Sequence, residues 1–110
     1  MTRLYLPTTM ARLRDFVEQG VLTGVEPVLA ESESEEDEYA AMLTAADLSQ
    51  AMLTETGRRV VVVAESSDPG VVPLSDVVAV HADPVPVAPH ADDLDDLAWY
   101  AVQELADLIG

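Results

Sequence analysis

The strongest constraint on the fold is a run of four valines, Val60 to Val63, with two arginines before it and an alanine after it. Valine is β-branched and favours extended backbone. The run does not alternate between apolar and polar residues, so it predicts a strand over residues 58–64 that is buried on both faces. Strands of this kind are typical of parallel sheets that carry helices on both sides. We therefore expect a central parallel strand.

The other elements follow from local signals. Short apolar segments predict three more strands, at residues 3–6, 26–30 and 77–82. Apolar residues at helical spacing predict three helices, at about 8–19, 36–56 and 92–109. We expect Thr8 to be the N-cap of the first helix and Gly20 to end that helix in the left-handed conformation.

This order of elements, β-α-β-α-β-β-α, predicts an α/β fold. Right-handed crossovers around a buried valine strand give a small single-domain sheet of about four mostly parallel strands with three helices. The chain has 110 residues, which suits one domain over residues 1–110. Within it we expect an acidic loop at 31–38 and a Pro-rich connector at 83–90.

Charge limits the possible partners. The formal net charge is −16, from 21 acidic residues against five arginines and no lysine. Such a field repels phosphate backbones and anionic lipid, so we expect neither direct nucleic-acid binding nor membrane binding. The chain has no cysteine and no apolar span of 18 residues, and we predict a cytoplasmic protein.

No catalytic, cofactor or metal motif stands out. The residue types of a nucleophilic site occur in Ser66, Ser67, His81 and His90, but no nucleophile elbow, phosphate-binding loop or dinucleotide fingerprint is present. His90 is followed by several aspartates, but a transition-metal motif would need a second histidine at helical spacing, and none is present. We therefore predict no catalytic residue, no cofactor and no metal, and an enzyme is less expected than a binding protein.

The acidic runs and the single tryptophan indicate an interaction surface. On a helix over 92–109, Trp99 falls outside the apolar stripe, beside carboxylates, and an amphipathic aromatic in that setting is a plausible hot spot for a cation. The candidate partner-binding residues are Trp99, Tyr100, Asp92, Asp95, Asp96, Gln103, Glu35, Glu36, Asp37 and Glu38.

The favoured function is a non-catalytic interaction module that binds a basic protein partner, with carboxylates that imitate nucleic-acid charge. Two alternatives stay open: a small enzyme or enzyme subunit with an unrecognised site, and a structural homo-oligomer. A homo-oligomer is expected to bury the second apolar stripe of the long helix at 36–56. An enzyme is expected to hold a histidine and a carboxylate with shifted pKa values in one concave pocket.

Three segments carry a family resemblance. They are Arg3-Leu4-Tyr5-Leu6-Pro7, Glu38-Tyr39-Ala40-Ala41 and Trp99-Tyr100-Ala101-Val102-Gln103-Glu104. Together they resemble an uncharacterised family of small actinobacterial proteins, a domain of unknown function with an N-terminal R-[LV]-Y-[LV]-P strand and a C-terminal W-Y-A-V-Q-E helix. The resemblance implies no catalytic residue.

Overall fold

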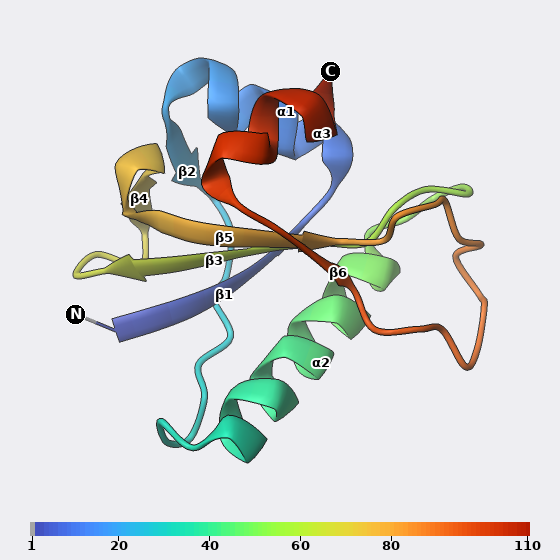
Figure 1. Cartoon of the computed structure of the whole chain (residues 1–110), viewed down its shortest axis with the longest axis horizontal. Helices are drawn as coiled ribbons and strands as arrows, with labels where there is room; N and C mark the ends of the chain where they lie inside the picture. Colours follow the sequence, from blue (N-terminus) through green and yellow to red (C-terminus); the bar gives the residue numbers. More distant parts are fainter. Residues whose placement is uncertain (1) are drawn as a thin grey trace.

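In the computed structural model of the chain, residues 2–110 are described, and they form a four-stranded sheet with helices on both faces (Figure 1). The elements in chain order are β1 (Thr2–Thr8), α1 (Met10–Gln19), β2 (Val21–Thr23), α2 (Glu35–Ala51), β3 (Val60–Ser66), β4 (Val71–Pro73), the 3-10 turn η1 (Leu74–Asp76), β5 (Val77–Ala82), β6 (Ala98–Tyr100), the 3-10 turn η2 (Val102–Glu104) and α3 (Leu105–Ile109).

The main sheet has the strand order β1-β3-β5-β6, and every neighbouring pair is antiparallel. A second sheet consists of β2 and β4, also antiparallel. The prediction of mostly parallel strands is therefore wrong, and so is the predicted order of elements. A run of valines indicates that both faces of its strand are covered, but it does not indicate the direction of the neighbouring strands. Here the neighbours are antiparallel, and the sheet lies between two covering layers.

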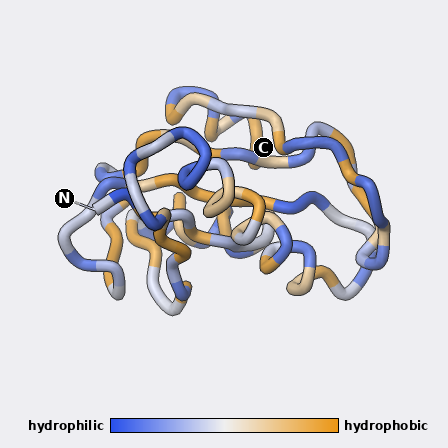
Figure 2. The backbone as a smooth tube through the Cα atoms, turned by 90° about the horizontal axis from the view of Figure 1, so that it is seen from below, coloured by the Kyte–Doolittle hydropathy of each residue, from blue (hydrophilic) through white to orange (hydrophobic). Residues whose placement is uncertain are grey.

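The valine strand is nevertheless central and buried on both faces. Val60 and Val62 belong to the larger core cluster, where α1, α3 and the small sheet cover the main sheet. Val61 and Val63 point to the other face and pack under α2. Figure 2 shows hydrophobic stretches along the central strands and hydrophilic stretches in the outlying loops.

The first part of the chain differs from expectation in its details. Thr8 lies inside β1, and Thr9 is the N-cap of α1, where its hydroxyl accepts a hydrogen bond from the Arg12 N–H at 3.3 Å. Gly20 ends α1 in the left-handed conformation, with φ of 77°, as predicted. No regular strand forms over 26–30, where Val28 makes only a single bridge to Tyr5 at the outer edge of β1. A proline at position 27 suits such an isolated contact.

The predicted helix over 92–109 is wrong for its first half. Residues 92–97 are irregular, 98–100 form β6, and only Leu105–Ile109 is α-helical. The same residues also alternate: Tyr100 and Val102 pack on the larger core, while Trp99 points to the opposite face. Pairing with β5 satisfies the backbone groups of Ala98 and Tyr100. That tertiary gain outweighs a helix that would have clustered four aspartates in its first turns.

Both faces of β3 can be tested by truncation. Val61→Ala and Val62→Ala each remove two buried methyl groups, on opposite faces. We expect each to lower the free energy of unfolding by about 1–3 kcal/mol in urea titrations. Val85→Ala is the control, since Val85 is 63% exposed, and it should stay within about 0.5 kcal/mol of the wild type. A costless change at Val61 would mean that α2 does not pack tightly on the sheet.

Candidate functional site

One face of the main sheet is only half covered by a helix. α2 packs on β1 and β3, where Ala41 and Ala45 allow it to approach Val61 closely. His81 on β5 pairs with Val61, and Trp99 on β6 pairs with His81, so all three side chains lie on this face. Among the described residues, no helix lies over the β5–β6 half of this face (Figure 1).

Two adjoining hollows follow the line between α2 and these strands, with volumes of about 450 and 460 Å³. Tyr39, Met42 and His81 line both, so the hollows form one groove, which we call the α2–β5 groove. The first hollow is bounded on its outer side by residues 91–97. The second opens towards Trp99, whose side chain is 61% exposed. The groove therefore combines an apolar floor with an accessible indole.

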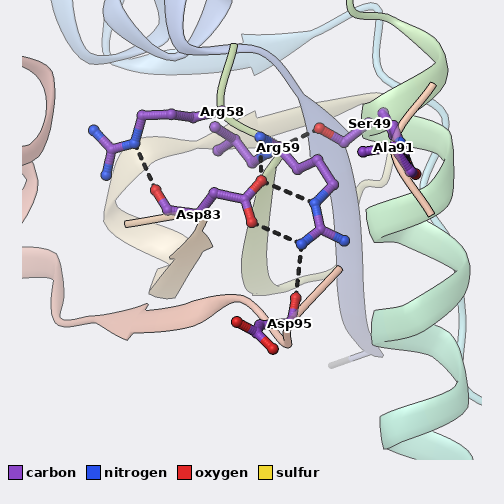
Figure 3. A network of polar contacts seen from close by, with 8 residues as sticks. Ser49, Arg58, Arg59, Asp83, Ala91 and Asp95 are labelled. Atoms are coloured by element: carbon purple, nitrogen blue, oxygen red, sulfur yellow. Dashed lines mark hydrogen bonds and ion pairs between the residues drawn. The ribbon is translucent and has the colours of Figure 1, made fainter. Parts of the chain in front are cut away.

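A buried ion pair holds the outer wall of the groove to the sheet (Figure 3). Arg59 donates from Nε to Asp83 Oδ2 at 2.8 Å and from Nη2 to Asp83 Oδ1 at 2.7 Å. Their side chains are only 7% and 5% exposed. The same Nη2 donates to the Asp95 carbonyl at 2.8 Å. The hydrogen bonds to Asp83 are the main cause of the raised pKa of Arg59, so this guanidinium stays charged.

Two further contacts tie the wall to α2. The Gln50 side chain donates to the Pro89 and Ala91 carbonyls at 3.2 and 2.9 Å. The Tyr39 hydroxyl donates to the Asp96 carboxylate at 2.9 and 3.1 Å, and this hydrogen bond raises the pKa of Tyr39. Segment 83–97 is thus positioned by side chains from both the sheet and the helix, although it has no regular structure of its own.

The groove carries a surplus of negative charge. Its carboxylates come from both sides: Glu38, Asp47, Asp92, Asp93, Asp95 and Asp96. Two arginines also line it, and both are already paired. Arg59 is bound by Asp83, while Arg3 contacts Glu38 at 3.2 Å and Glu65 at 3.0 Å. A cation that entered the first hollow would therefore meet carboxylates that have no paired arginine, whereas the second hollow, which Trp99 lines, holds Glu38 with its partner Arg3.

His81 lies on the floor of the groove and is partly buried. Burial lowers its pKa, so the imidazole is neutral near pH 7. Within residues 2–110, no hydroxyl or carboxylate makes a hydrogen bond to its ring. The histidine therefore contributes a flat, uncharged surface to the groove, next to Trp99 on the neighbouring strand.

The structure brings together five of the candidate partner-binding residues. Trp99, Asp92, Asp95, Asp96 and Glu38 line the groove.

The other five lie elsewhere. Tyr100 packs on the opposite face, where its hydroxyl accepts a hydrogen bond from Arg58 Nη2 at 3.3 Å. Gln103 lies near α1 and the C-terminal helix. Glu35, Glu36 and Asp37 form the first turn of α2, capped by the Ser34 hydroxyl, and do not line the groove.

Several residues of the site were not among the candidates, and they include Tyr39, Met42, Arg59 and His81. Their sequence signals were weak. Tyr39 and Met42 have the spacing of an apolar helix stripe, and His81 lies in a predicted strand beside valines, so both patterns indicate packing rather than a site. An arginine directly before a run of valines was a usable signal, because a cation next to a buried strand needs a buried anion.

The described residues contain neither a metal-binding cluster nor a membrane-spanning helix. Among residues 2–110, no group of three or more His, Asp or Glu side chains lies close enough to hold a metal ion. Over the same residues, no helix has the length and apolar character to cross a membrane.

The ion pair at the wall gives the first prediction for this site. Asp83→Ala leaves the Arg59 guanidinium buried without its anion, and we expect it to lower the free energy of unfolding by about 3–5 kcal/mol. Glu65→Ala breaks the exposed pair with Arg3 and should cost no more than about 1 kcal/mol. Replacing both partners, Arg59→Met with Asp83→Leu, should recover most of the loss. Equal effects of the two single variants in urea titrations would contradict a structural role for Asp83.

The second prediction concerns pH. The folded chain has a lowered His81 pKa, so as pH falls below the ordinary value the unfolded chain binds a proton that the folded chain does not. Between about pH 7 and about pH 5, stability should therefore fall more in the wild type than in His81→Gln. Urea midpoints at a series of pH values measure the difference. Parallel curves for the two proteins would show that the imidazole titrates alike in both states.

Comparison with known proteins gives a family but no activity. No curated protein and no solved structure matches the chain. One family matches residues 2–93, which includes β1 to β5 and most of the groove wall but stops before Trp99. Because the match spans most of the 110 residues, the chain belongs to the family of unknown function DUF6912.

Proposed function

We propose that this protein is a non-catalytic interaction module and that its α2–β5 groove binds a basic segment of another protein. The observation that carries the proposal is the setting of Trp99. Its exposed indole stands at the open end of a groove whose free charges are all carboxylates. An arginine or lysine side chain placed there stacks on the indole while its charge is met by the aspartates.

The shape of the groove supports a peptide segment as the ligand. Its floor is formed by Tyr39, Met42 and His81, which accept the aliphatic stem of a long cationic side chain. Its wall supplies Asp95 and Asp96 at the rim. Aromatic anchors surrounded by polar rims are the usual arrangement of binding hot spots.

The net charge of −16 sets the class of partner. It disfavours direct contact with nucleic acid or anionic lipid and accelerates encounters with basic proteins. The proposed partner is therefore a basic protein of the kind that otherwise contacts phosphates, and the carboxylate rim imitates those phosphates. We place this interaction in the cytoplasm, where we expect the protein to act.

One observation favours a second candidate, a small enzyme. The first hollow holds a neutral histidine, His81, together with several carboxylates, which is the arrangement expected of a general base in a concave site. An enzyme also needs a group that orients the imidazole, and none of the described residues makes a hydrogen bond to it. The binding module is therefore the better supported function.

The test separates Trp99 and the rim from bulk charge. Basic proteins captured on the immobilised chain from a lysate of its own cells are purified and titrated against variants by calorimetry. Trp99→Ala should weaken binding by about 2 kcal/mol or more while changing the free energy of unfolding by less than about 1 kcal/mol. Asp95→Lys with Asp96→Lys should slow association, and most strongly at low salt.

The matched control is Asp15→Lys with Glu18→Lys on α1, which makes the same change in net charge on the opposite side of the sheet. This variant should bind nearly as the wild type does. If both double variants weaken binding equally, the attraction is a property of net charge and the groove is not the binding site. If neither Trp99→Ala nor the rim variant weakens binding, the proposed function is wrong.

A further inference from the structure

The edge strand next to the groove has unused hydrogen-bonding groups. β6 is the last strand of the main sheet and pairs on one side only, with β5. In an antiparallel ladder, successive residues direct their N–H and C=O groups alternately towards one neighbour and then the other. The register of the sheet therefore decides which backbone groups of β6 face outwards.

Two separate contacts fix that alternation, one between the central strands and one at the outer edge of β1. The Asp83 N–H donates to the Arg59 carbonyl at 3.1 Å, so residues 59 and 83 form a hydrogen-bonded pair. Two positions along each strand, Val61 and His81 form the next such pair. The N–H and C=O groups of Val80 and Ala82 are therefore directed at β6. Independently, Tyr5 on β1 exchanges hydrogen bonds with Val28 on its outer side, at 3.0 and 2.8 Å.

Carried across β1, β3 and β5, the Tyr5 contact gives the same phase. Ala98 and Tyr100 consequently bond β5, whereas the N–H and C=O of Trp99 point away from the sheet. Within residues 2–110 these two groups have no hydrogen-bond partner.

The open edge is short because the next outward position is closed. The Ala101 N–H donates to the Glu104 carboxylate at 3.0 Å, and the Ala101 carbonyl accepts from the Glu104 N–H at 2.9 Å. Trp99 is thus the residue of β6 that offers both a main-chain donor and acceptor outwards and an exposed side chain over the groove.

We infer that the partner segment binds as an added antiparallel strand on β6, an inference that rests on the proposed function. In such a pair, one residue of the segment exchanges both main-chain hydrogen bonds with Trp99, and its side chain lies on the same face as the indole. That face is the acidic groove, so this residue and those two positions away are basic. The intervening residues face the other side, beside Tyr100, and are apolar.

Charge distinguishes this partner from a second copy of the chain. A second copy would approach with the same net charge of −16, and its own edge segment, residues 92–104, holds no arginine to place in the groove. Bodies of like charge repel each other, whereas arginines at alternate positions of an added strand are complementary to the groove. The segment that fits is therefore extended, basic at every second residue, and supplied by another protein.

The experiment uses three blocked seven-residue peptides of alternating arginine and valine, titrated against the whole chain. The first is unmodified. The second is N-methylated at three of its four arginine amides, which face β6 in the proposed pairing. The third is N-methylated at its three valine amides, which face solvent. The chain has a single tryptophan, so its fluorescence reports on Trp99 directly.

We expect the unmodified peptide to bind in a salt-sensitive way and the arginine-methylated peptide to bind about tenfold or more weakly by comparison. The valine-methylated peptide should bind within about twofold of the unmodified one, since its lost donors are unpaired. Hydrogen exchange at the Trp99 amide should slow by about tenfold or more on saturation with the unmodified peptide.

The possible failures are distinguishable. If both methylated peptides bind like the unmodified one and the Trp99 amide exchanges at its free rate, strand addition is wrong while groove binding through side chains stands. If valine methylation alone weakens binding, the antiparallel pairing is wrong. If the unmodified peptide binds no better than its analogue with glutamate in place of arginine, the proposed function falls together with this inference.

Discussion

The buried pair of Arg59 and Asp83 is the interaction on which the rest of this structure depends. It joins the start of the central strand to the end of its neighbour, in a place where an unpaired charge would be very costly. Because the same guanidinium also binds the Asp95 carbonyl, one cation positions both the sheet and the irregular wall beside it. The polar groups it satisfies are what allow a segment without regular structure to stay in place.

The sequence was a good guide wherever local and tertiary forces agreed. The valines of β3 predicted a strand buried on both faces, and the long helix at α2 was predicted within a few residues at its start. The direction of the strands could not be read in this way, since burial on both faces reflects what covers a strand and not how its neighbours run. Residues 98–102 fit both a helical stripe and a strand alternation, and pairing with β5 decided between them.

The candidate site could be predicted only in part for a related reason. Trp99 and the aspartates of 92–96 were recognisable as residue types that are unusual together. Their placement on a helix was incorrect, yet the groove brings five of the ten candidates together. His81 and Tyr39 reach the same groove from 42 positions apart in the sequence, through the register of the sheet and the packing of α2, and neither is encoded in a local pattern.

The closure of Ala101 by Glu104 has a consequence for how the protein behaves in a crowded solution. A long unpaired strand edge is a template for uncontrolled self-assembly, and evolution tends to blunt such edges. Here the Glu104 carboxylate caps the Ala101 N–H, so the exposed backbone ends just after Trp99 and only a short segment can be added. So short an open edge is a poor template for a fibril, because each added chain would gain few main-chain hydrogen bonds.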